Sequence, residues 1–203
     1  DLINQIDKNT KIFFISNPCS PFGNLYTDEE INSLIRYAEK NRILLCLDEA
    51  YIDFAPSITH KNLKDSDFLI RLRTFSKGLG IAGARIGFCL ASDQIINLLK
   101  SIQLTFPITG PSLAFCEYLL TNYDEVKKNI DNVIKTRERV LEKLLNQGFD
   151  VLKSNTNSIH FHAPDNKVNI LLQTIKKHNV LIKAGDKIGT PVMIPGDARN
   201  TWI

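Results

Sequence analysis

The segment Thr74-Phe-Ser-Lys-Gly-Leu-Gly-Ile-Ala-Gly-Ala-Arg85 follows an apolar run and combines a lysine, a glycine-rich turn and an arginine. Lys77 carries an amine that can act as a nucleophile. The hydroxyl of Ser76, the backbone N–H groups of the turn and the guanidinium of Arg85 are donors of the kind that hold a phosphate. The segment therefore predicts a reactive amine beside a phosphate-binding turn at the end of a strand.

Outward from this segment, the first 92 residues alternate short apolar runs with one helical stretch. Strands are predicted at residues 12–16, 43–48, 68–74 and 85–91, and several are apolar throughout, as in a sheet covered on both faces. A helix is predicted between the first two, where Thr27 and Glu30 match a capping box. Its apolar face consists of Ile31, Leu34, Ile35 and Ala38. Strand–helix–strand in this order predicts a parallel α/β unit.

The second half of the chain predicts longer helices and few strands. Helices are expected over residues 93–104 and 124–147, the second ending near Gly148, which suits a helix C-terminus. A strand over 158–163, a helix over 167–178 and a strand over 180–183 follow. We predict an α/β fold with a three-layer, mixed but mainly parallel sheet in residues 1–123. Residues 124–203 are predicted to form a connecting helix and part of a smaller α+β domain.

Composition excludes several classes of protein. The 203 residues carry 25 basic and 22 acidic side chains, a net charge of +3, with no basic block, so nucleic acid is not expected as a partner. No apolar stretch approaches the roughly 20 residues that span a bilayer. The cysteines are widely spaced without a C-x-x-C pair, which favours free thiols in a reducing cytoplasm. Because the chain starts without Met and enters a strand almost at once, we expect it to be a piece of a longer protein.

Two motifs resemble nucleotide-binding signatures, and neither is complete. Gly78-Leu-Gly-Ile-Ala-Gly83 has G-x-G-x-x-G spacing, but a strand follows where that fingerprint needs a helix. The acidic pair Asp48 and Glu49 ends a strand as in a Walker B motif, but no upstream phosphate loop exists in the sequence. A nucleotide-binding α/β domain is therefore the weakest hypothesis.

The H-x-H pair His160 and His162 has the spacing of two metal ligands on one strand face. No third ligand lies nearby in the sequence, so a solvated strand face is the favoured interpretation.

Polar clusters follow three of the predicted strands. They are the loop Asn17-Pro-Cys-Ser-Pro-Phe-Gly23, residues 48–53 and residues 74–78. In open α/β sheets, ligands bind beyond the carboxyl ends of the strands. We therefore expect these three clusters to converge on one site.

Two stretches carry a family resemblance that covers essentially the whole chain. They are Leu72-Arg-Thr-Phe-Ser-Lys-Gly-Leu-Gly-Ile-Ala-Gly-Ala-Arg-Ile-Gly-Phe88 and Leu47-Asp-Glu-Ala-Tyr-Ile-Asp-Phe54. With them, the chain resembles the fold type I aminotransferases that depend on pyridoxal 5′-phosphate (the aspartate aminotransferase fold). Within that group it is most similar to the histidinol-phosphate aminotransferase branch.

The resemblance implies a role for each matching residue. Lys77 would form the internal aldimine and move a proton between Cα and the cofactor, and Asp48 would pair with the pyridine nitrogen. Tyr51 would hydrogen-bond the 3′ oxygen of the ring. Ser76 and Arg85 would hold the cofactor phosphate, with Thr74 as a weaker candidate.

The chain departs from the family pattern at positions that bear on the site. Ser20 and Phe22 stand where the family loop has Asn and Thr, and the Asn contacts the 3′ oxygen. Lys183 stands where the histidinol-phosphate branch has an Arg that grips the substrate phosphate, so a point charge replaces a planar fork. The family's N-terminal part and its substrate-carboxylate Arg, which would follow the segment Thr201-Trp-Ile203, lie outside this sequence.

The expected activity is transamination between a small amino acid or amino-acid phosphate and a 2-oxo acid. The resemblance also implies a homodimer. Two alternatives stay open: a pyridoxal-phosphate-dependent decarboxylase of an amino-acid phosphate, and a non-catalytic remnant of the fold.

Overall fold

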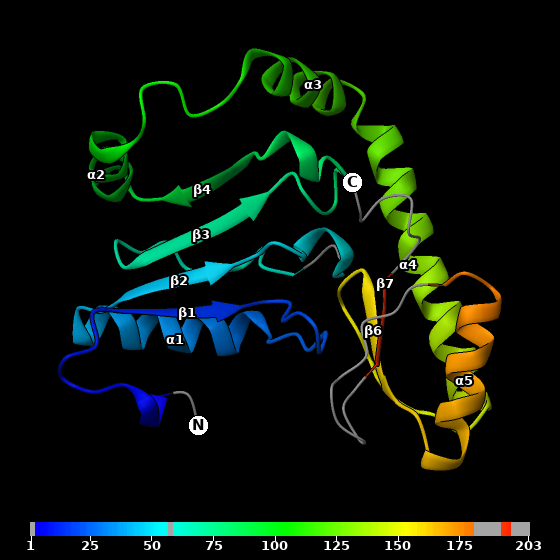
Figure 1. The fold of residues 1–203 in the computed structure, drawn as a ribbon. Coiled ribbons are helices and arrows are strands. Elements are labelled where there is room, and N and C mark those ends of the chain that lie inside the picture. Colours follow the sequence, from blue (N-terminus) through cyan, green and yellow to red (C-terminus); the bar gives the residue numbers. More distant parts are fainter. Residues whose placement is uncertain (1–2, 57–58, 181–191, 196–203) are drawn as a thin grey trace.

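A computed structural model describes residues 3–56, 59–180 and 192–195 (Figure 1). Four strands form the first sheet: β1 (Ile12–Ser16), β2 (Leu44–Asp48), β3 (Leu69–Thr74) and β4 (Gly87–Ala91). Their order is β1-β2-β3-β4, with the first three parallel and β4 antiparallel to β3. The predicted mixed, mainly parallel sheet of an α/β fold is thereby confirmed.

Helix α1 (Asp28–Asn41) packs on one face of this sheet, below β1 and β2 in Figure 1. Its capping box forms as predicted: Thr27 Oγ1 accepts from Glu30 N, and the Glu30 carboxylate accepts from Thr27 N. The predicted apolar face of the helix is buried against side chains of the sheet, Phe13, Leu45, Leu47 and Leu69. On the opposite face Phe14 is 67% exposed.

The connections around β3 contain only short 3-10 helices. Between β2 and β3 the chain forms η2 (Ile52–Phe54), and between β3 and β4 it forms η3 (Ala82–Ala84); a third short turn, η1 (Ile3–Gln5), precedes the sheet. Because β4 runs antiparallel to β3, the segment between them turns at the carboxyl end of β3. Residues 75–86 therefore lie at the same edge as the ends of β1 and β2.

Three helices lead away from the sheet: α2 (Asp93–Ile102), α3 (Gly110–Thr121) and α4 (Tyr123–Asn146). Helices α2 and α4 match the predictions to within two residues, and Gly148 follows α4 with φ +76°. Helix α3 was not predicted. It is capped by Thr109, whose Oγ1 accepts from Ser112 N, but its apolar residues surround the axis and show no helical periodicity.

A second, antiparallel sheet follows α4. It contains β5 (Asp150–Leu152), β6 (Ser158–His162) and β7 (Val192–Pro195) in the order β5-β6-β7, beside α5 (Asp165–Lys177). Strand β6 and α5 confirm predictions, whereas β5 and β7 were not predicted. The core of this unit consists of Phe149, Ile159, Phe161 and Ala163. Val180 lies outside any strand, and the rest of the predicted strand 180–183 falls outside the described residues. The domain boundary at residue 123 stays a prediction.

Candidate functional site

The three polar clusters meet at the carboxyl edge of the parallel strands. Strands β1 and β2 end side by side, with Ser16 opposite Asp48, and Asn17 N donates to Asp48 O at 2.9 Å. Strand β3 ends at Thr74, which lies opposite Gly87 at the start of β4. The loop 17–23, residues 49–54 and the turn 75–86 therefore share one edge of the sheet, as expected.

Asp48 is half-buried at this edge and takes part in no ion pair within the described parts of the chain. Its Oδ1 accepts from Ala50 N at 2.9 Å, which orients the carboxylate. One carboxylate oxygen is therefore held by the backbone. No donor among the described residues reaches the other oxygen, so it is available to a bound cation.

Lys77 lies in the turn after β3, close to Tyr51. Its Nζ is 5.3 Å from the centre of the Tyr51 ring, and Gly80 N donates to Lys77 O, which closes the turn. The structure thus brings Asp48, Tyr51 and Lys77 to the same edge of the sheet from two different loops.

The predicted phosphate-binding residues lie in the same turn. Ser76 N donates to Thr74 Oγ1 at 3.0 Å, and that hydroxyl donates to the Ile86 carbonyl at 3.3 Å. Thr74 therefore shapes the turn through both of its contacts. Arg85 is exposed and adopts a left-handed conformation with φ 54°, and its guanidinium donates to Ala82 O. The Ser76 side chain and most of the Arg85 fork remain available to an anion.

Ser20 is half-buried in the loop 17–23, which contacts the C-terminal unit. Asn155 donates to the Gly23 carbonyl from both its backbone N and its Nδ2, each at 2.9 Å. Gly23 has φ +78°, and a Cβ there would lie 2.5 Å from Ser154 Cα. The loop that carries Ser20 is therefore fixed by a residue far away in the sequence. Lys183 falls outside the described residues.

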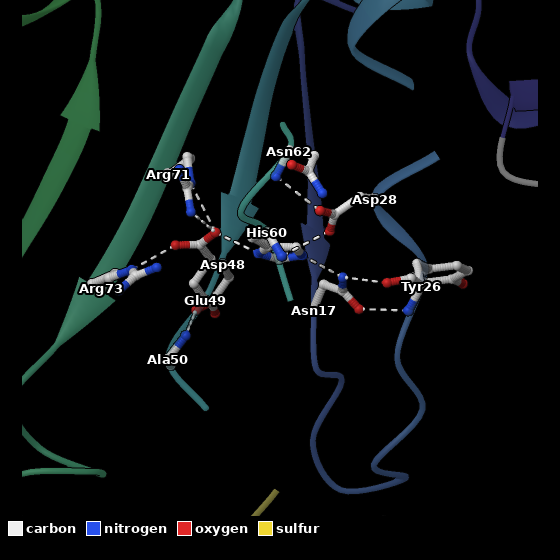
Figure 2. Close-up of polar contacts among 10 residues, drawn as sticks. All are labelled: Asn17, Tyr26, Asp28, Asp48, Glu49, Ala50, His60, Asn62, Arg71 and Arg73. Carbon is white, nitrogen blue, oxygen red and sulfur yellow. Dashed lines mark hydrogen bonds and ion pairs between the residues drawn. The ribbon is translucent and has the colours of Figure 1, made fainter. Parts of the chain in front are cut away.

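A buried charged cluster lies beside Asp48 (Figure 2). It was not predicted from the sequence. At its centre is Glu49, whose side chain is completely buried. Its Oε1 accepts from His60 Nδ1 at 2.5 Å and from Arg71 at 2.8 Å, and its Oε2 accepts from Arg73 Nε at 2.7 Å. Burial alone would raise the pKa of Glu49, but the hydrogen bonds from His60 and the two arginines lower it to about 2.

His60 joins this cluster to the loop after β1. Its Nε2 lies 2.6 Å from Asn17 Nδ2, and its backbone N donates to Asp28 Oδ1 at 2.7 Å. Part of the cluster could be predicted from the sequence, because side chains alternate along a strand and Arg71 and Arg73 therefore share one face. His60 comes from an irregular loop, so no periodicity indicates its position.

Two further side chains, Asp53 and Arg137, make contacts that fix the segments around the site. Asp53 lies directly against the backbone of Gly78, the residue after Lys77, and burial raises the pKa of the Asp53 carboxyl. Arg137, buried in α4, donates from one nitrogen to Phe54 O at 3.1 Å and to Thr156 O at 2.8 Å. Asp53 thus joins the loop that bears Tyr51 to the turn that bears Lys77, and Arg137 holds the same loop through Phe54.

The expectation that His160 and His162 lie on a solvated strand face is wrong for His160. That side chain is only 7% exposed, because β6 is the central strand of its sheet and the ring packs against Phe22 at 5.0 Å. Burial lowers the pKa of His160.

Comparison with known proteins places this arrangement in a family. Residues 1–201 match the family described as aminotransferase class I and II. The chain belongs to that family. It is 31% identical over 194 residues to histidinol-phosphate aminotransferase 2 of Legionella pneumophila (strain Paris), an alignment that covers 91% of this chain and 49% of the relative. The chain thus spans about half the length of the curated relatives that it matches.

Solved structures of several proteins share the fold. Histidinol-phosphate aminotransferase from Sinorhizobium meliloti, solved in complex with pyridoxal-5′-phosphate, superposes with a TM-score of 0.80 at 25% identity, over 94% of this chain and 54% of the other. L-threonine-O-3-phosphate decarboxylase from Porphyromonas gingivalis gives a TM-score of 0.76 at 19% identity, over 95% and 62% of the two chains, which shows the fold alone.

The side chains gathered at the sheet edge fit the cofactor of such an aminotransferase. Pyridoxal phosphate presents an aldehyde, a ring nitrogen, a 3′ oxygen and a phosphate, and each requires a different partner. This edge carries a lysine amine, a phenol, hydroxyl and guanidinium donors, and a carboxylate that forms no ion pair with any described residue.

Proposed function

We propose that this chain forms part of a pyridoxal-phosphate-dependent aminotransferase. The observation that carries the proposal is the position of Lys77 Nζ, 5.3 Å from the Tyr51 ring, at the edge where Asp48 takes part in no ion pair among the described residues. An amine nucleophile and an available carboxylate are the two groups that bind opposite ends of the cofactor ring.

Bound pyridoxal phosphate supplies an electron-accepting ring that allows a bond at the Cα of an amino acid to break. Lys77 would hold the cofactor through its amine and would take and return the substrate proton at Cα. Asp48 stabilises a proton on the ring nitrogen. Tyr51 would donate a hydrogen bond to the 3′ oxygen, and Ser20 would reach it through a water.

The turn 75–86 binds the phosphate in this proposal. The hydroxyl of Ser76 and the guanidinium of Arg85 donate to it, and Thr74 keeps the turn in shape through its contacts with Ser76 and Ile86.

We propose as substrates a small amino acid or an amino-acid phosphate similar to histidinol phosphate, together with a 2-oxo acid as amino acceptor. The name of the Legionella relative supports this choice. Lys183 would then attract a substrate phosphate as a point charge.

One experiment on the full-length protein tests the cofactor assignment. Purified protein supplied with pyridoxal phosphate should develop visible absorbance, and borohydride should attach the cofactor to Lys77, as peptide mass spectrometry would show. Lys77→Ala should abolish both signals, whereas Lys127→Ala, at an exposed position on α4, should leave them intact. Protein that stays colourless and unlabelled would refute the proposal and favour the non-catalytic alternative.

The products distinguish transamination from decarboxylation. An aminotransferase converts the amino acid to an oxo acid and aminates the acceptor, whereas a decarboxylase releases carbon dioxide and leaves the amine. The likeness to the Porphyromonas decarboxylase extends to the fold alone, so we propose transamination as the main activity.

We further propose that the protein is a cytoplasmic homodimer. All four cysteines are free thiols, which supports a reducing compartment, and none of the described helices is both long and apolar enough to cross a membrane.

Apolar side chains are strongly exposed from α2 to α3, including Ile102, Leu104 and Phe106. Monomers rarely expose so continuous an apolar stretch, and a second copy of the chain would cover it.

A further inference from the structure

We infer that Glu49 acts as a positioning residue that neutralises Arg71 and Arg73, and so leaves the neighbouring Asp48 free to pair with a cationic ring nitrogen. Asp48 and Glu49 are adjacent in sequence and alike in chemistry, yet the structure gives them opposite surroundings. The inference rests on the proposed function, because the ring nitrogen belongs to the proposed cofactor.

Strand geometry separates the two carboxylates. Successive residues of a strand point to opposite faces, and the ladder continues past Asp48, since Glu49 N donates to Leu72 O at 2.9 Å. Glu49 therefore points to the face that also carries Arg71 and Arg73, whereas Asp48 points to the other face. Figure 2 shows the two arginines reaching Glu49 from β3, while the side chain of Asp48 is joined only to Ala50 among the residues drawn.

The hydrogen bonds of Glu49 account for both of its oxygens. Arg71 and His60 donate to Oε1, and Arg73 donates to Oε2, all within 2.8 Å. The arginine side chains are only 20% and 30% exposed, so water screens their charges incompletely. Arg71, Arg73 and Glu49 together carry a net charge of +1, and without the Glu49 carboxylate the two arginines would place a charge of +2 beside Asp48. The carboxyl of Asp53 also lies within electrostatic range of Arg73 and Glu49, and it is common to wild type and to every variant below.

Asn17 keeps His60 from adding a further charge. Tyr26 N donates to Asn17 Oδ1 at 2.7 Å and Asn17 Nδ2 donates to Tyr26 O at 3.1 Å, which fixes the orientation of the amide. Nδ2 must then also donate to His60 Nε2, which accepts and carries no proton. The single ring proton therefore sits on Nδ1 and points at Glu49. The groups that face the imidazole are thus Glu49 and Asn17, while Asp28 accepts from its backbone N–H.

A charge series measured with two cofactors tests the inference on the full-length protein. The probes are pyridoxal phosphate and its 1-deaza analogue, in which C–H replaces the ring nitrogen and no pairing with Asp48 is possible. Dissociation constants for both are measured on wild type and on variants that change the net charge of the cluster. Glu49→Gln raises that charge by one and Arg73→Gln lowers it by one. The double variant restores the original value.

We expect the preference for pyridoxal phosphate over the analogue to fall about tenfold in Glu49→Gln, because an uncompensated cation nearby weakens the pairing of Asp48. In Arg73→Gln the preference should rise, and in the double variant it should return toward wild type. Arg73→Gln keeps the test decisive if Glu49→Gln does not fold. Equal losses of affinity for both probes would mean a merely structural role and would overturn the inference.

A second measurement needs no cofactor. The ¹⁵N chemical shifts of His60 should show one protonated nitrogen, Nδ1, at neutral pH, and a doubly protonated ring or the other tautomer would also overturn the inference. If wild type binds neither probe, the proposed function fails instead, and the tautomer of His60 still reports on the geometry of the cluster.

Discussion

Gly78 is the position at which the lysine-bearing turn meets a side chain from another loop. A Cβ added at Gly78 would lie 2.5 Å from Asp53 Cγ and 2.6 Å from Asp53 Cβ, closer than non-bonded carbon atoms approach. The absence of a side chain at Gly78 therefore allows the turn to rest directly on Asp53, one residue from Lys77.

Gly78→Ala should destabilise the protein by about 1–3 kcal/mol, because overpacking forces the turn or the η2 segment to move. It should also weaken the retention of pyridoxal phosphate, since Lys77 moves with the turn. Gly83→Ala in the same segment is the matched control, because a Cβ there meets nothing within 4 Å. Denaturant unfolding and cofactor titration measure the two effects. Equal behaviour of the two variants would show that the Asp53 contact does not position the turn.

At the residue scale, the low pKa of Glu49 also predicts how the stability of the protein depends on pH. Its folded pKa of about 2 lies below the ordinary value of 4.5, so the charged form stabilises the fold above about pH 4.5. That contribution is lost as the pH falls through the folded pKa. The gap between the two values corresponds to on the order of 3 kcal/mol.

The free energy of unfolding should therefore fall more steeply in wild type than in Glu49→Gln between about pH 4.5 and pH 2. Above pH 5 the difference between the two proteins should be constant. Urea titrations at a series of pH values measure it, and parallel curves through the acidic range would contradict the low pKa.

At the scale of secondary-structure elements, sequence patterns predicted those parts of the fold that local chemistry determines. The capping box at Thr27 and Glu30 and the apolar face that follows define α1 from adjacent residues alone. Helix α3 was missed because its apolar residues surround the axis, so its hydrophobic pattern has no helical period. Strands β5 and β7 are only three and four residues long, too short for an alternating pattern to indicate a strand, and β7 pairs with residues of β6 more than 30 positions earlier in the chain.

Helix α4 is joined to two loops through Arg137, and this contact is testable. Arg137→Met should destabilise the protein by about 2–4 kcal/mol, since it leaves the buried carbonyls of Phe54 and Thr156 without a donor. Arg139→Met, at an exposed position on the same helix, should change stability by less than about 0.5 kcal/mol. Thermal and chemical denaturation compare the two. A small cost in Arg137→Met would mean that water replaces the guanidinium.

At the scale of the whole molecule, topology predicted that the three strand-end clusters lie together, and the structure places them at one edge of the sheet. The pairing of Glu49 with His60 was not predictable, because it joins a strand end to an irregular loop that carries no periodic signal. The contact of Asn155 with Gly23 was not predictable either, since it joins two turns in different halves of the chain.

The exposed apolar stretch from α2 to α3 predicts how copies of the protein associate. Phe106, 89% exposed, lies at its centre, and Phe106→Asp should shift the full-length protein from dimer toward monomer. Ile170→Asp is the control, because Ile170 is also strongly exposed but lies on α5. Size-exclusion chromatography with light scattering gives the masses. A dimer unaffected by Phe106→Asp would place the interface elsewhere.

The hydrogen bonds between Asn155 and Gly23 have a consequence for the order in which the protein is made. They join residues 132 positions apart, so the ribosome synthesises the loop with Ser20 long before the residue that fixes it. Domains begin to fold from the N-terminus during synthesis, and the first sheet can form from residues already released. The loop beside it acquires its final shape only after Asn155 has emerged. Complete assembly of the proposed cofactor site should therefore follow synthesis of Asn155.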